Sequence, residues 1–112
     1  MELPTPLSPE LTELIASRFR LLSEPMRIRI LDRLREDELS VSELVAELGT
    51  SQQNISKHLT ILQRDGILAR RRDGNRAIYR IADRSVLDLC EHVCGSVERR
   101  AAELGRLVGR PG

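Results

Sequence analysis

Two short amphipathic patterns joined at Gly49 constrain the fold of this chain more than any other feature. Residues 40–48 and 51–65 both carry apolar residues at helical spacing, and in the second they recur at i, i+4 and i+7 from Ile55. Glycine suits the left-handed conformation that often follows a helix end. A short helix, a glycine turn and a second helix with a polar outer face together predict a helix-turn-helix.

Residue pairs with capping-box spacing mark the expected starts of both helices. Ser40 and Glu43 form one pair, and Thr50 and Gln53 form the other. We therefore expect the two helices to be separated by a turn at Gly49-Thr50.

The outer face of the second helix differs from an ordinary solvated face, which is usually built from glutamate and lysine. Amides bond bidentately to adenine, lysine bonds to guanine, and serine bonds to several base edges. Carboxylates would repel phosphate, and this face holds almost none. Its side chains are Gln52, Gln53, Ser56, Lys57 and Thr60.

A basic β-hairpin is predicted directly after these helices. Residues 67–81 alternate between apolar and polar and contain Asp-Gly, a strong hairpin signal, so strands are expected near 67–72 and 76–81. Such a hairpin after a helix-turn-helix is called a wing. It reaches the DNA backbone or the minor groove beside the major-groove site of the helix. The alternative is an ordinary charged hairpin that covers a core. The arginines expected round its tip are Arg70, Arg71, Arg72 and Arg76.

The distribution of charge along the chain supports the prediction of a surface that binds phosphate. The whole chain has a net charge of only +1, but residues 51–80 hold seven Lys and Arg against two acids, whereas residues 1–50 hold six Arg against ten acids. A basic patch on a nearly neutral protein is the electrostatic footprint of a nucleic-acid-binding surface. The alternative is a solvated charged surface, which is the commoner case for any single run of arginines.

The remaining segments complete a mainly α fold with one small β-hairpin. Helices are expected from Pro9 and from Pro25, and a long helix over 84–108 closes the chain. The expected order is therefore α-α-α-α-β-β-α, a winged helix-turn-helix. We expect one DNA-binding and dimerisation domain over residues 9–108, with an N-terminal tail at 1–8 and a C-terminal tail at 109–112.

The apolar stripes of the first and last helices exceed what one small core can bury. We therefore expect residues 9–22 and 84–108 to form the interface of a homodimer. The stripe of the last helix consists of Val86, Leu89, Cys90, Val93, Val97, Ala101, Leu104 and Val108.

Composition excludes several other classes. No apolar run approaches the roughly 18 residues that span a membrane, and only two cysteines are present, so we expect a cytoplasmic protein with reduced thiols and no membrane partner. One Phe, one Tyr and no Trp argue against stacking of single-stranded bases. An enzyme would need a nucleophile–base pair or a general acid in a pocket. Both histidines lie on helices with other expected roles, so we do not expect an enzyme.

Several segments resemble the ArsR/SmtB family of small bacterial winged-helix repressors. They are LLSEPMRIRILDRL, ELSVSELVAELGTSQQNISKHLTILQRDGIL and RRRDGNRAIYRI, and the resemblance covers roughly residues 11–107. It implies a symmetric homodimer that binds a double-stranded DNA operator and leaves it when a metal or other signal binds. His58 sits where the family usually has a histidine, and we expect it to pack and hydrogen-bond; the alternative is that it serves as a ligand. The family's operator-reading positions are matched by Ser51, Gln52, Gln53, Ser56 and Lys57, and Arg70, Arg72 and Arg76 of the wing complete the predicted DNA-binding set.

The sensing positions depart from the family pattern. Members that sense soft metals through the third helix resemble ELCVCDL, whereas this chain has ELSVSEL, with Ser40 and Ser42 in the cysteine places. A hydroxyl is a poor ligand for a soft metal, so that site is expected to be absent. On the last helix Asp83 matches one ligand of the zinc and nickel pattern, but the other positions hold Ser85, Ser96 and Arg99.

Two thiols remain as candidate sensors. Cys90 and Cys94 are four residues apart and share one helix face. A pair from each protomer could bind a thiophilic or transition metal ion, or be oxidised. The alternative is packing, because cysteine behaves as a small hydrophobe.

The favoured function is a repressor released from its operator by a metal or thiol-reactive signal. One alternative is a winged-helix regulator without a metal effector, acting as an activator or with a partner, in which the cysteines belong only to the core. Another is a protein-interaction module that has lost operator reading, but the four wing arginines count against it.

Overall fold

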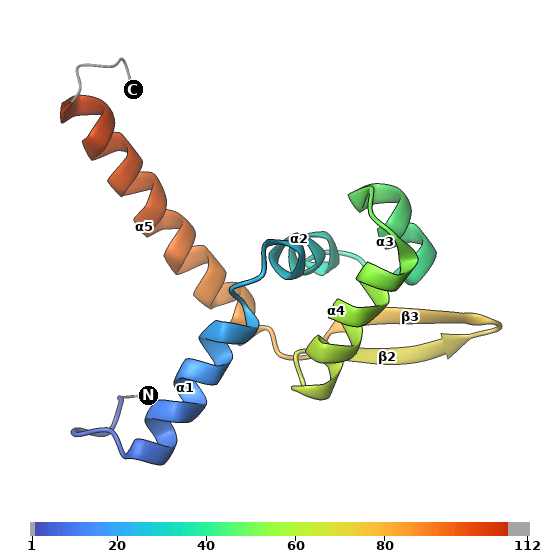
Figure 1. Ribbon diagram of the computed structural model, residues 1–112, viewed down its shortest axis with the longest axis horizontal. Helices are drawn as coiled ribbons and strands as arrows, with labels where there is room; N and C mark the ends of the chain where they lie inside the picture. Colours follow the sequence, from blue (N-terminus) through green and yellow to red (C-terminus); the bar gives the residue numbers. More distant parts are fainter. Residues whose placement is uncertain (1, 108–112) are drawn as a thin grey trace. The chain divides into compact units, whose positions relative to one another are not determined.

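The computed structural model describes residues 2–107. The chain divides into two compact units between Ala82 and Asp83. The first unit contains seven elements: α1 (Pro9–Leu21), α2 (Pro25–Leu34), β1 (Leu39–Ser40), α3 (Val41–Leu48), α4 (Gln52–Arg64), β2 (Leu68–Asp73) and β3 (Arg76–Ile81). The second contains α5 (Ser85–Leu107) (Figure 1). Val108 and the expected tail at 109–112 lie outside the described residues.

The helix-turn-helix is confirmed, with one change in its capping. The hydroxyl of Ser40 accepts the Glu43 N–H at 3.2 Å, and the Glu43 carboxylate accepts the Ser40 N–H at 2.9 Å, which is the predicted capping box. Gly49 follows α3 with φ +66°. The second predicted capping box, at Thr50 and Gln53, is wrong. Ser51 caps α4 instead, because its hydroxyl accepts the Asn54 N–H at 3.1 Å.

A three-stranded antiparallel sheet, in the order β1-β3-β2, contains the predicted hairpin. Strands β2 and β3 pair from Leu68 opposite Ile81 to Asp73 opposite Arg76, and Gly74, with φ +63°, begins the two-residue loop between them. Strand β1 was not predicted. Its two residues pair with β3 and place Leu39 opposite Tyr79.

The core of the first unit holds α4 by its apolar side. Three leucine and isoleucine side chains of α4 are completely buried, at 0% exposure. They lie among equally buried residues of α2, α3 and the segment before β2. These residues are Ile55, Leu59 and Leu62 on α4, with Ile30, Leu31, Leu44 and Ile67 from the surrounding segments. Because burying each such side chain contributes about 1.5–3 kcal/mol, the packing holds α4 with its polar side outward.

Several large apolar side chains on α1 and α5 are exposed. They include Leu14, Phe19, Val93, Val97 and Leu104, with exposures between 46% and 68%. Within residues 2–107, no helix combines the length and the apolar character needed to cross a membrane.

Candidate nucleic-acid interface

The outward side of α4 presents a continuous polar surface, which we call the reading face. It consists of Gln53, Ser56, Lys57, Thr60 and Arg64, and with Ile61 it lines a shallow depression of about 570 Å³. No acidic residue lines this depression. Amide, hydroxyl and cationic groups are the side chains that bond to base edges in the major groove.

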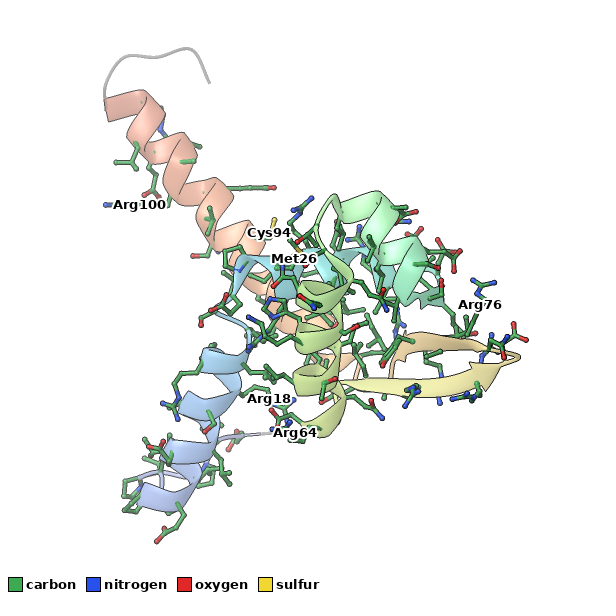
Figure 2. The ribbon with its side chains drawn as sticks, turned by 45° about the vertical axis from the view of Figure 1, so that its right-hand side comes forward. Arg18, Met26, Arg64, Arg76, Cys94 and Arg100 are labelled. Carbon is green, nitrogen blue, oxygen red and sulfur yellow. The ribbon has the colours of Figure 1, made fainter. Side chains whose placement is uncertain are left out.

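Arg64 belongs to the reading face although it was not in the predicted DNA-binding set. It follows Gln53, Lys57 and Thr60 at i, i+4, i+7 and i+11, so helical spacing alone would have included it. Figure 2 shows Arg64 at the end of α4.

The other two predicted reading residues of α4 have different surroundings. Ser51 precedes the helix and its hydroxyl already accepts a backbone N–H, although it can still donate one hydrogen bond. Gln52 lines a second depression, of about 390 Å³, together with Ser42 of α3 and Asn75 and Arg76 of the hairpin. The structure therefore places Gln53, Ser56 and Lys57 on one surface and turns Gln52 toward the hairpin.

The hairpin of β2 and β3, residues 68–81, is the wing. Its buried residues lie away from the loop, at Leu68, Ile78, Tyr79 and Ile81, and residues 70–76 are all exposed. The wing therefore extends beyond the core, and Figure 1 shows it projecting past α4.

The strand register divides the wing arginines between two faces. Arg70 and Arg72 lie opposite Tyr79 and Ala77 on one face, whereas Arg71 lies on the other face with Arg76. Arg71 Nε donates to Glu38 Oε1 at 3.1 Å, and Arg76 Nη2 donates to Glu43 Oε1 at 2.7 Å. Among residues 2–107, no ion pair or hydrogen bond engages the guanidinium of Arg70 or Arg72.

Glu43 joins the wing to the first helix of the helix-turn-helix. The same oxygen, Oε1, accepts both the Ser40 N–H and the Arg76 guanidinium. The hydrogen bonds with Ser40, followed by the charge of Arg76, hold the pKa of Glu43 below its usual value. Glu43 is therefore ionised at neutral pH and remains paired with Arg76.

His58 is a buried structural residue on the inner side of α4. It is 4% exposed, and its Nδ1 accepts a hydrogen bond from Arg27 Nε at 3.1 Å. Arg27 also donates to the Leu21 carbonyl at 3.0 Å, so it connects the end of α1 with α4. Burial, followed by the charges of Arg27 and Lys57, lowers the pKa of His58 and keeps it neutral. The structure thus shows the expected packing and hydrogen-bonding role.

The two cysteines lie on one side of α5 in different surroundings. Cys90 is half-buried, and burial raises its pKa. Cys94 is exposed and its thiol donates to Glu98 Oε1 at 3.6 Å; this hydrogen bond and the Glu98 charge raise its pKa. Within the described part of the chain, no group of three or more His, Cys, Asp or Glu side chains is arranged to hold a metal ion. The described part of one chain therefore does not offer a closed four-ligand site at the two thiols.

Serine hydroxyls occupy several of the other positions at which family members bind metals. Ser40 Oγ lies 3.2 Å from Ser42 Oγ at the start of α3. Asp83 accepts hydrogen bonds from both the backbone N–H and the hydroxyl of Ser85. Both positions are held by local hydrogen bonds and lack soft ligands.

Comparison with known proteins agrees with this architecture. A family model described as a helix-turn-helix domain matches residues 22–71. The HTH-type transcriptional regulator Rv0081 of Mycobacterium tuberculosis is 43% identical over 83 residues, which cover 73% of each chain. Its crystal structure superposes with a TM-score of 0.78 at 38% identity, covering 86% of this chain and 97% of that one.

Two further relatives connect the chain with a named family. The HTH-type transcriptional repressor SmtB of M. tuberculosis is 37% identical over 93 residues, covering 80% of this chain and 69% of SmtB. The homodimeric winged helix-turn-helix DNA-binding domain Mb0332 of Mycobacterium bovis is 28% identical with a TM-score of 0.72, covering 88% and 91% of the two chains. These likenesses are to helix-turn-helix transcriptional regulators, a family of non-enzymatic DNA-binding proteins. The chain belongs to the ArsR/SmtB family of winged helix-turn-helix transcriptional regulators.

Proposed function

We propose that this regulator represses transcription by placing the reading face of α4 in the major groove of a double-stranded operator. The observation that carries the proposal is the acid-free polar surface of α4, held outward by a helix side that is completely buried. A repressor role is supported by the similarity to SmtB, which is named a transcriptional repressor.

The residues divide the work of recognition by their chemistry. Gln53, Ser56 and Lys57 offer an amide, a hydroxyl and an ammonium to base edges. We expect Ser51, which caps α4, and Gln52, which lines the depression beside the hairpin, to contact the edge of the groove or the DNA backbone. The wing supplies attraction to phosphate that does not depend on sequence.

We further propose that the protein acts as a homodimer through α1 and α5. A dimer would cover the exposed apolar side chains of both helices, and Mb0332, a structural relative, is itself homodimeric. In a twofold dimer the two copies of α4 would lie about 34 Å apart, which is one turn of DNA. The proposed DNA-binding and dimerisation domain spans residues 9–108, between tails at 1–8 and 109–112.

The proposed effector is a thiophilic or transition metal ion, or a thiol-reactive signal, that acts at Cys90 and Cys94. The two thiols are too few for a complete donor set, so either the partner chain or nearby acids such as Glu98 must contribute further ligands to a metal site. Both thiol pKa values are raised, and a thiol must deprotonate before it binds a metal, so the response should weaken as pH falls.

The sensing proposal is tested with a panel of thiophilic and borderline metals and an oxidant, added to the reduced protein on DNA. An effective signal should weaken DNA binding by roughly 5- to 150-fold, the range of a coupling of about 1–3 kcal/mol. The double variant Cys90→Ser, Cys94→Ser should bind DNA normally and lose the response. Normal release by this variant would show that the thiols are not the sensor.

A further inference from the structure

We infer that Arg71 and Arg76 position the wing through ion pairs with Glu38 and Glu43, and that Arg70 and Arg72 supply its phosphate contacts. The inference rests on the proposed contact of the wing with DNA. It assigns different tasks to four of the five arginines in one hairpin.

The wing arginines extend from two opposite faces of the hairpin. Neighbouring residues of a strand point to opposite faces, and the pairing of β2 with β3 places Arg70 and Arg72 together on one face. Arg71 and Arg76 lie on the other face. Figure 2 shows Arg76 rising from the wing on the side of α3.

The guanidinium groups of the wing differ in what they already contact. Arg71 and Arg76 bond to carboxylates at 3.1 Å and 2.7 Å, from the residue before β1 and from α3. These two contacts tie the wing to the body of the first unit at two points. Arg70 and Arg72 have no such partner among residues 2–107, so their charges are available to phosphate.

The salt dependence of binding depends on how many cations are released and taken up when the protein binds DNA. An unpaired arginine that meets a phosphate releases a cation condensed on the DNA. If Arg76 met a phosphate, it would leave the ionised Glu43 carboxylate beside the DNA, and that carboxylate would take up a cation. The uptake cancels the release. An arginine paired with a carboxylate therefore contributes little to the salt dependence of binding, even if it lies near the backbone.

The two ion pairs also affect the position of the wing. Both ion pairs are half-exposed, so they contribute little to overall stability. They are long-range contacts, however, each joining residues 33 positions apart in the sequence. Their loss would mainly loosen the wing relative to α3 and α4.

One test measures the salt dependence of binding to a random-sequence duplex by fluorescence anisotropy. The variants are Arg70→Gln and Arg72→Gln, and the double variants Glu38→Gln, Arg71→Gln and Glu43→Gln, Arg76→Gln, all in the full chain. Arg70→Gln and Arg72→Gln should each reduce the slope of log K against log salt by about one per protomer. The double variants Glu38→Gln, Arg71→Gln and Glu43→Gln, Arg76→Gln leave no unpaired carboxylate beside the DNA, so they should leave that slope unchanged.

A second measurement, amide hydrogen exchange of the free protein, tests the positioning role. Glu43→Gln keeps the capping box, because glutamine also serves at that position. Arg76→Gln, Glu43→Gln and the double variant should all speed exchange in the wing by the same factor, about two- to fivefold for the loss of one exposed ion pair.

The possible outcomes separate the inference from the proposed function. Equal slope losses for Arg72→Gln and for the double variant Glu43→Gln, Arg76→Gln would overturn the inference while leaving DNA binding by the wing intact. Additive effects of Arg76→Gln and Glu43→Gln on exchange would also overturn it. A wild-type protein without salt-dependent DNA binding would overturn both the inference and the proposed function.

Discussion

Helices α4 and α5 are both amphipathic, but they expose opposite sides. The apolar side of α4 is completely buried at Ile55, Leu59 and Leu62, and its polar side is exposed. On α5 the apolar side is itself exposed, with Val93 at 50% and Val97 at 61%.

The contrast shows which of the two helices has its apolar side buried within a single chain. The core of a single chain already determines how α4 presents its reading face. The apolar side of α5 has no comparable cover, and exposed apolar patches commonly mark interaction sites. The proposed DNA-reading surface on α4 is therefore formed by one chain alone. The proposed assembly surface on α5 needs a second chain to bury it.

Removing a buried side chain from α4 is the strongest test of this contrast. Leu59→Ala should lower the free energy of unfolding by about 2–5 kcal/mol, because it leaves a cavity in the core. The neighbouring change Thr60→Ala, on the reading face, should alter it by less than about 0.5 kcal/mol. Urea denaturation measures both, and equal losses would contradict the described packing of α4.

A charge placed on the apolar side of α5 tests the assembly surface. Val97→Glu should raise the dimer dissociation constant by at least a hundredfold, since each uncompensated charge buried at an interface costs about 3 kcal/mol and the dimer would carry one on each chain. Glu91→Ala, an exposed position off the apolar stripe, serves as the control. Sedimentation equilibrium measures the effect. A wild-type protein that stays monomeric at every concentration would refute the proposed role of α5.

The smallest expected effect concerns His58 and pH. Its pKa is lowered in the folded protein, so the unfolded chain binds more protons as pH falls below about 6.5. Stability should therefore decrease as pH falls through this range. His58→Gln keeps an acceptor for Arg27 but should show a weaker decrease. Urea midpoints measured across this range would contradict the account if both proteins had the same pH dependence.

Features set by neighbouring residues could be predicted from the sequence. The proline start of α1 after Ser8, the capping box at Ser40 and the turns at Gly49 and Gly74 each depend on a few adjacent residues. The polar face of α4 was also predictable, because helical spacing determines which residues share a side.

Features set by contacts between distant residues could not be predicted in the same way. Strand β1 has only two residues, too few to show alternation, and it exists because it pairs with β3. The ion pair between Arg76 and Glu43 depends on the same long-range fold. The start of α4 was misplaced for a local reason, since Thr50 and Ser51 are both acceptable caps and only the backbone conformation shows which one is used.

We propose that the reading face of α4 selects the DNA sequence and that the wing only strengthens binding. The most direct test compares Gln53→Ala and Arg72→Gln on a duplex selected by the wild-type protein from a random pool, and on random DNA. Gln53→Ala should lose about 1–3 kcal/mol on the selected duplex and little on random DNA. Arg72→Gln should weaken both alike. A loss of sequence preference with Arg72→Gln, and none with Gln53→Ala, would contradict the account.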